Sequence, residues 1–222
     1  MEAAGLLRAP VFDRDPPHEG IPVKKSLFAL ALAAAPFLAN ASESNGIGYN
    51  YAQLDYVYVD ANSPYLNGGQ LSGSYAFTDN LFATGSYGEA SDKSFGDKYK
   101  VESWSLGLGF NTAIGGNADW VSKIAYVDND FHNRELDGCI VDCRWGEHLK
   151  GGQISTGMLG RVVDGLTANA YLGYEDFNHG YKGNFYADFG MVYAFNKTWG
   201  LHGGLKLAEG TDTYTVGVRA SF

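Results

Sequence analysis

The sequence has few cysteines, prolines and charged residues, and its composition excludes several classes of protein. Charged residues make up 18% of the 222 residues and aromatic residues 14%, which is too little charge and too much aromatic content for a disordered chain. Acidic residues outnumber Lys and Arg by 25 to 16, and this excess argues against a nucleic-acid partner. The 30 glycines follow no Gly-x-y period, which excludes collagen. A single all-β domain is the expected class.

The N-terminal region has the pattern of an export signal. Lys24 and Lys25 precede a mostly apolar run over residues 26–38, and Ala39-Asn40-Ala41 follows it. This is the order of a secretory signal peptide with an A-x-A cleavage site, and the run is too short to cross a bilayer as a helix. We therefore expect residues 23–41 to be a cleaved signal peptide. Residues 1–22 precede the basic residues with which signal peptides begin, and we interpret them as a start-site artefact.

The predicted mature chain, residues 42–222, contains one proline and alternates large apolar with small or polar residues. In residues 101–110, for example, Trp104, Leu106, Leu108 and Phe110 share one face, while Ser and Gly occupy most of the other. Period-2 alternation predicts β-strands. A face of small and polar residues suits a barrel lumen better than bulk water.

Ten alternating segments are predicted, at residues 47–59, 68–77, 81–90, 101–110, 118–128, 152–163, 166–175, 184–195, 199–208 and 213–222. Short turns follow the even-numbered segments, and longer polar loops, including Asn129 to Gly151, follow the first, third, fifth and seventh. Outer-membrane barrels alternate their connections in this way. Ten residues at about 3.3 Å each, tilted by about 40°, rise about 25 Å, the height of the apolar band in such barrels. We predict a closed antiparallel transmembrane β-barrel of ten strands, with eight strands as the alternative.

Outward aromatic residues are expected to form one girdle at each end of this barrel. Such girdles occupy the membrane–water interfaces. Near the short turns they are Phe77, Phe110, Trp120, Phe195, Trp199 and Phe222, and near the longer loops they are Tyr58, Tyr87, Trp104, Tyr126, Tyr174, Phe185 and Tyr214.

Residues 50–56, 73–77, 171–176 and 196–201, together with the signal peptide and the terminal Phe222, are strand and turn motifs that resemble one known family. This is the diffusible-signal-factor-regulated family of small outer-membrane barrel proteins of Gram-negative bacteria. The resemblance implies residence in the outer membrane or its vesicles and, loosely, a biofilm or signalling role. Residues 129–151, with their two cysteines, depart from the pattern of that family.

Ionisable residues of both signs fall on the predicted inward face. They are Asp55, Lys123, Arg161, Glu175, Asp188, His202, Lys206 and Arg219. Opposite charges in a narrow lumen are expected to pair and to form a structural network. The alternative is a small gated pore in which some of these charges line a path.

Candidate chemistry is sparse. Cys139 and Cys143 lie in the longest predicted loop of an exported protein, so we expect a local disulfide. No second cysteine cluster supports a metal site, and no cofactor motif is present. Several acidic and histidine residues lie in predicted loops, as in aspartate-histidine barrel proteases, but strands that only span the membrane would not raise them above it. They are Asp128, Asp130, His132, His148, His179 and Asp212. We expect no enzyme, no metal and no cofactor.

The sequence therefore predicts a non-enzymatic outer-membrane barrel that presents surface loops and serves in envelope structure, adhesion or biofilm. The alternative function is a narrow, porin-like channel for ions or a small solute. Expected partners are outer-membrane lipids, lipopolysaccharide and the barrel-insertion machinery, with no nucleic acid and a monomeric state. In the proteins that the chain resembles, a terminal aromatic residue such as Phe222 belongs to the signal that this machinery reads.

Overall fold

The computed structural model describes residues 47–61, 65–92, 98–134, 144–178 and 183–222. The chain divides into two units, Met1–Ala34 and Ala35–Phe222, and all described residues belong to the second. The predicted signal peptide, the predicted start-site artefact, Cys139 and Cys143 lie outside the described residues. Within the described ranges, no helix is long and apolar enough to cross a membrane.

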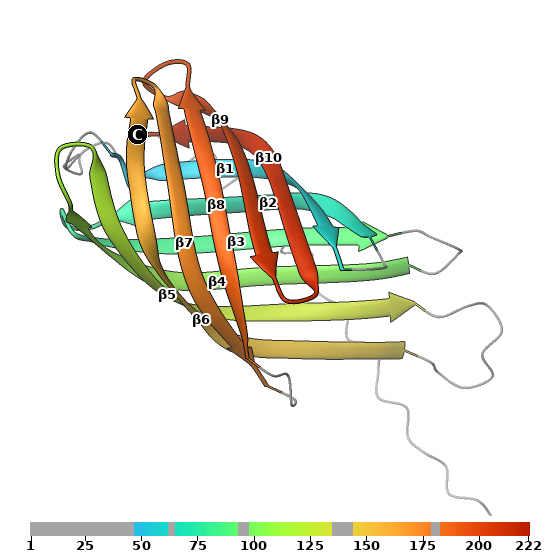
Figure 1. The fold of residues 1–222 in the computed structure, drawn as a ribbon. Helices are drawn as coiled ribbons and strands as arrows, with labels where there is room; N and C mark the ends of the chain where they lie inside the picture. The colour runs from blue at the N-terminus through green and yellow to red at the C-terminus, as the bar shows by residue number, and fades with distance from the viewer. Residues whose placement is uncertain (1–46, 62–64, 93–97, 135–143, 179–182) are drawn as a thin grey trace, which may run out of the picture. The chain divides into compact units, whose positions relative to one another are not determined.

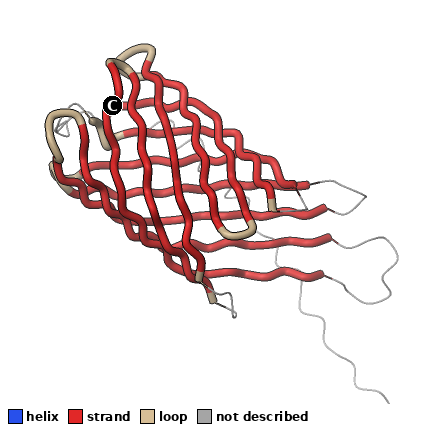
Figure 2. The backbone as a smooth tube through the Cα atoms, viewed as in Figure 1, coloured by secondary structure: helices blue, strands red, loops and turns tan. Residues whose placement is uncertain are grey.

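Ten antiparallel strands form a closed barrel (Figures 1 and 2). Each strand pairs with its neighbours in the sequence, and β1 closes the ring by pairing with β10. The strands are β1 Tyr51–Asp60, β2 Tyr65–Ala76, β3 Leu81–Asp92, β4 Lys98–Ala113, β5 Ala118–Arg134, β6 Arg144–Val163, β7 Leu166–Phe177, β8 Asn184–Ala194, β9 Trp199–Ala208 and β10 Thr211–Ser221. The prediction of an all-β, ten-stranded barrel is confirmed, and the eight-stranded alternative is wrong.

One end of the barrel, here called the short-turn rim, holds the turns after β2, β4, β6 and β8, and the opposite end is called the long-loop rim. Side chains of the turns cap their own backbone: Thr78 Oγ1 accepts from the N–H of Leu81 at 3.0 Å, and Asn196 Oδ1 accepts from that of Trp199 at 2.8 Å. Gly165, in the two-residue turn between β6 and β7, has a φ of 79°, a conformation that favours glycine.

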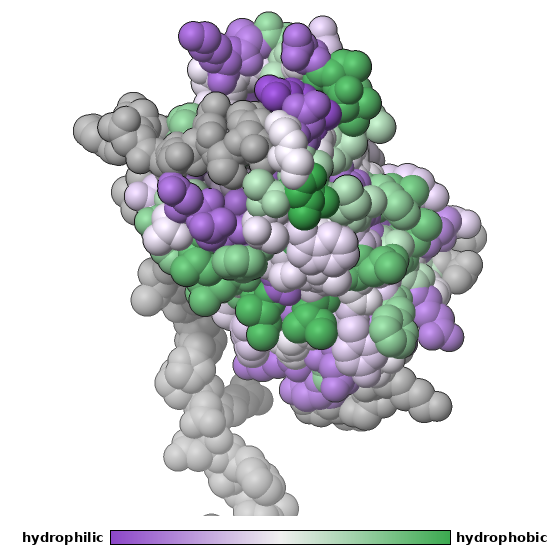
Figure 3. Space-filling model, turned by 60° about the vertical axis from the view of Figure 1, so that its left-hand side comes forward, coloured by the Kyte–Doolittle hydropathy of each residue, from purple (hydrophilic) through white to green (hydrophobic). Residues whose placement is uncertain are grey.

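Alternation along the strands divides the side chains into a lumen face and an outer face. The outer face is apolar, with Leu106 63% and Leu172 69% exposed, whereas the lumen-facing Val121 is 1% exposed. Across the face shown in Figure 3, green and white side chains gather in the middle, and purple side chains lie above and below them. Exposed aromatic residues such as Phe77 and Trp199 lie at the short-turn end of this apolar surface, and Trp104 lies on the side of the long-loop rim. A closed barrel with this surface has the construction of outer-membrane barrels.

Strands β4, β5 and β6 are longer than predicted, with 16, 17 and 20 residues. Residues 98–103, 129–134 and 144–149 continue the ladder in register beyond Trp104 and Tyr126, and we call these residues the β4–β6 extension (Figure 1). The predicted loop from Asn129 to Gly151 is therefore wrong over most of its length. The polar sequence of these residues predicted a loop. It is compatible with strands here, because the extension lies beyond the apolar band and its outer face need not be apolar.

Candidate functional site in the lumen

The lumen holds most of the ionisable residues that the sequence placed there, and they lie in paired groups. In the first group, which we call the β1 network, Gln53 joins Arg219 to Asp55. Arg219 Nε donates to Gln53 Oε1 at 2.6 Å, and Gln53 Nε2 donates to Asp55 Oδ2 at 2.5 Å. His202 Nδ1 lies 2.8 Å from Asp55 Oδ1. Asp55 is buried, so these partners compensate for the loss of its hydration.

The second group lies across β7, β8 and β9. Lys206 Nζ lies 2.6 Å from Glu175 Oε2 and 4.3 Å from the centroid of the Tyr186 ring. Asp188 accepts a hydrogen bond from Asn169 Nδ2 at 3.0 Å. Glu175 and Lys206 thus form a pair of opposite charges on the wall, and Asp188 is held by a neutral amide.

A third group lies near the short-turn rim. Tyr49, which precedes β1, donates its hydroxyl to Asp119 Oδ2 at 2.8 Å, and its ring stacks on Phe82 with centroids 4.7 Å apart. Burial and the hydrogen bond to Asp119 raise the pKa of Tyr49 well above its ordinary value. Ala76, Phe82, Val121 and Tyr171 form the buried apolar cluster against which Tyr49 packs.

Two lumen-facing glycines allow aromatic rings to lie flat against the wall. The Phe82 ring occupies the space that a Cβ on Gly109 would need, and the Tyr186 ring does the same at Gly173. Any larger residue at Gly109 or Gly173 would push the ring towards the barrel axis. These glycines therefore determine how far Phe82 and Tyr186 reach into the lumen.

The remaining predicted site residues are Lys123, which contacts the third group through Tyr171, and Arg161. Lys123 Nζ lies 3.9 Å from the centroid of the Tyr171 ring. Arg161 lies at the short-turn rim, where its guanidinium donates to Asn117 Oδ1 at 3.3 Å, in the turn between β4 and β5. Phe222 ends the chain at the same rim and donates its backbone N–H to Asn50 O at 3.2 Å.

Sequence reasoning missed Gln53, Tyr49 and Asp119. Asp119 precedes the outward Trp120, so the alternation itself indicated an inward carboxylate, and the structure shows it fully buried. Gln53 carries no charge and so was not among the ionisable residues considered. Tyr49 falls in the predicted segment 47–59, in phase with the inward Asp55, but β1 begins only at Tyr51. Its partner Asp119 is 70 residues away in the sequence and could not be identified from alternation.

Above the apolar band, the outer face of β5 and β6 has a small charged cluster. His148 Nε2 lies 3.5 Å from Asp130 Oδ1, and Lys150 Nζ lies 3.7 Å from Asp128 Oδ2. These residues lie on strands and face outward, so the predicted loop placement of Asp128, Asp130 and His148 is wrong. No three His, Cys, Asp or Glu side chains in the described ranges are arranged to hold a metal ion.

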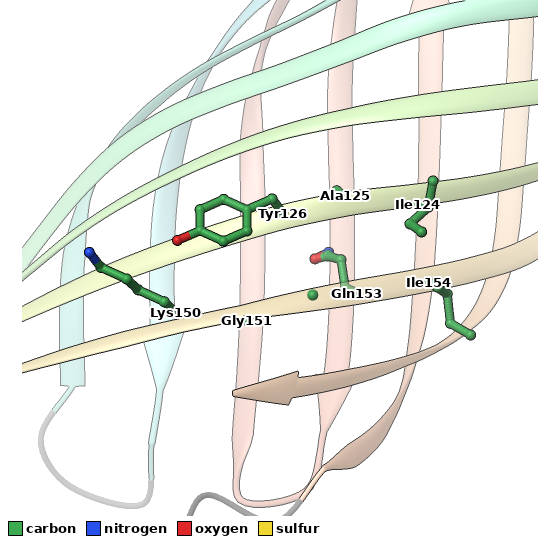
Figure 4. A pocket seen from close by; sticks show the side chains of 8 residues that line it. Ile124, Ala125, Tyr126, Lys150, Gly151, Gln153 and Ile154 are labelled. Atoms are coloured by element: carbon green, nitrogen blue, oxygen red, sulfur yellow. The ribbon is translucent and has the colours of Figure 1, made fainter. Parts of the chain in front are cut away.

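Below this cluster is a shallow depression of about 410 Å³ on the outer wall. Ile124 and Tyr126 of β5 and Lys150 and Ile154 of β6 are among its lining residues (Figure 4). Gly152 lies opposite Tyr126 in the ladder, and its missing side chain contributes to the space. Its lining residues include no member of the three lumen groups.

No family model matches the chain, and no curated protein matches it. Solved structures with a similar arrangement include the translocator domain of the autotransporter NalP from Neisseria meningitidis, at 12% identity and a TM-score of 0.48 over 89% of this chain and 95% of that one. The N-terminal β-barrel domain of Pseudomonas aeruginosa OprF has 17% identity and a TM-score of 0.42 over 79% of this chain and 100% of its own. The NanC porin has 8% identity and a TM-score of 0.49 over 77% and 100%. Scores below 0.5 carry no argument about function, and the barrel assignment rests on the strand pairing of this chain.

Proposed function

We propose that the chain is a non-enzymatic outer-membrane barrel that acts by binding at its long-loop rim, in adhesion, biofilm or envelope structure. The observation that carries this proposal is the β4–β6 extension. The three strands continue for six residues beyond Trp104, Asp128 and Lys150, which is about 20 Å at 3.3 Å per residue. Spanning a bilayer does not need this length, so a role outside the membrane accounts for it.

The lumen supports a binding role better than conduction. A selective pore commonly presents rings of one charge sign, whereas here Glu175 pairs with Lys206 and Asp55 accepts a hydrogen bond from Gln53. Paired charges stabilise the interior but provide little selectivity. A narrow channel remains the second candidate. The observation in its favour is that Phe82 and Tyr186 lie against wall glycines and not across the lumen.

The two rims indicate how the barrel is oriented in the outer membrane. Short turns face the periplasm in outer-membrane barrels, so we assign the short-turn rim to the periplasm and the β4–β6 extension to the cell exterior. Export by the predicted signal peptide, residence in vesicles and a monomeric state belong to this proposal. So do contacts with lipids and lipopolysaccharide, insertion through the machinery that reads Phe222, and the disulfide between Cys139 and Cys143.

A deletion that removes residues 135–143 together with the two outermost β5–β6 pairs of the extension tests the binding role. His132 and Gly146 face each other in the ladder, so replacing residues 133–145 by an Asn-Gly turn leaves a shorter hairpin. We expect cells that display this variant to lose most of their attachment to surfaces and to each other, with unchanged outer-membrane levels.

The matched control is Tyr171→Phe, which alters a buried lumen residue and leaves the exterior unchanged. Attachment should then equal that of the unaltered protein. Undiminished attachment of the deletion variant, at equal surface levels, would contradict the proposal.

A further inference from the structure

We propose that residues 47–50, which precede β1, form a plug that closes the short-turn end of the lumen, and that the barrel conducts ions when this segment is displaced. The segment lies outside the strand ladder, since β1 begins at Tyr51. Displacement of its residues 47–49, with Asn50 still bonded at the rim, would therefore break no strand pairing. The proposal goes beyond the binding role, because it concerns the lumen and the opposite rim.

Asn50 anchors the segment at the rim. Its side-chain Oδ1 accepts from the backbone N–H of Ala76 in β2 at 2.7 Å, and its backbone oxygen accepts from Phe222 at 3.2 Å. These two bonds attach the start of β1 to β2 on one side and to the end of β10 on the other. The residues before Asn50 are thereby held at the mouth of the lumen, where Ile47 is 3% exposed.

Tyr49 crosses the lumen. In a ring of ten strands, β5 is four positions from β1, and five positions is the greatest possible separation. The hydrogen bond from Tyr49 to Asp119 on β5 therefore joins nearly opposite walls. The ring also contacts Phe82 on β3 along the way.

The other polar contacts in the lumen join strands that lie close together in the ring. Gln53 with His202, Glu175 with Lys206, and Lys123 with Tyr171 each join strands two positions apart. Arg219 with Gln53 and Asn169 with Asp188 join adjacent strands. Among these polar contacts, the hydrogen bond from Tyr49 is the one that joins nearly opposite walls, and Tyr49 belongs to a segment that precedes the ladder. It packs there against the apolar cluster of Ala76, Phe82, Val121 and Tyr171.

The test is single-channel recording in planar bilayers, on protein purified from outer membranes. We expect the unaltered barrel to be closed nearly all of the time. Tyr49→Ala should increase the open time at least tenfold, because both the stacked ring and the hydrogen bond to Asp119 are lost. Tyr49→Phe keeps the ring and should produce a smaller increase.

Tyr56→Ala is the matched control, since Tyr56 lies on β1 but faces outward and is 53% exposed. It should leave the open time unchanged. If Tyr49→Ala does not assemble, the open time of Asp119→Asn tests the plug instead. This substitution weakens the same hydrogen bond and keeps the size of the side chain.

Resistance to SDS before boiling shows that a variant is folded. If the folded Tyr49→Ala barrel stays closed, or has the same open time as the unaltered protein, the plug proposal is wrong. An increase in open time supports the plug. It is measured in Tyr49→Ala or, if that variant does not assemble, in Asp119→Asn. The binding role is independent, because it is measured by attachment of the extension variant and not by current.

Discussion

Asp55 is a lumen residue whose burial and hydrogen bonds are expected to stabilise the fold. Asp55 is 4% exposed, and its carboxylate accepts a hydrogen bond from Gln53 and lies 2.8 Å from His202 Nδ1. Asp55→Ala leaves the partner groups without their acceptor, and we expect the free energy of unfolding to fall by about 1–3 kcal/mol. Urea unfolding of the refolded barrel in detergent micelles measures the change.

Asp176→Ala serves as the control for Asp55, because Asp176 is an exposed carboxylate near the end of β7. Its effect should remain within about 0.5 kcal/mol. A double-mutant cycle of Asp55→Ala with His202→Ala should give a coupling of about 0.5–3 kcal/mol. Additive effects would mean that the β1 network does not act as a unit.

Phe222 is expected to matter more for assembly than for stability. Burying one aromatic side chain at the interface contributes about 1.5–3 kcal/mol, which a barrel of this size can lose and still fold. Deletion of Phe222 should sharply reduce the amount of protein in the outer membrane, measured by fractionation, and change refolding in detergent little. Unchanged cellular levels, or failure to refold in detergent, would show that the assembly-signal interpretation is wrong.

At the level of a strand, the alternation of β4 can be tested by adding a charge to each face. Leu106 is exposed on the outer face, and Ser105 faces the lumen, where its hydroxyl lies 2.7 Å from that of Ser86. Leu106→Arg should lower the free energy of unfolding in lipid vesicles by about 2–4 kcal/mol, because the cation lies among acyl chains. Ser105→Arg should cost less, since the lumen is polar. Equal costs would show that the two faces are not distinct in the way the register requires.

The strands were predictable because their pattern repeats locally, and their full extent was not. Trp104, Leu106 and Leu108 specify which face of β4 is outward, since a slip of one residue would exchange the faces. The β4–β6 extension lacks this signal, because beyond the apolar band both faces can be polar. The contact between Tyr49 and Asp119 was also beyond sequence reasoning, since it depends on how the whole ring closes.

For the molecule as a whole, closure determines both stability and location. A closed barrel has no free strand edge along its membrane-spanning part, so its backbone groups are paired without water. Closure depends on β1 and β10, the most distant strands in the sequence, which pair over ten positions from Tyr51–Ser221 to Asp60–Asp212. The account of the apolar band, the lumen groups and the plug depends on this pairing.

A disulfide trap between β1 and β10 tests closure most directly. Leu54 and Val218 are paired on the outer face, and Cβ atoms of such pairs are about 4.5–5.5 Å apart, close enough for a disulfide after mild oxidation. In a Cys139→Ser, Cys143→Ser background, Leu54→Cys with Val218→Cys should cross-link in outer membranes, and the boiled, non-reduced chain should migrate faster. Leu54→Cys with Val216→Cys, a diagonal pair about 7–8 Å apart, should not. Absence of the first cross-link in heat-modifiable protein, or equal cross-linking of both pairs, would contradict a barrel closed in this register.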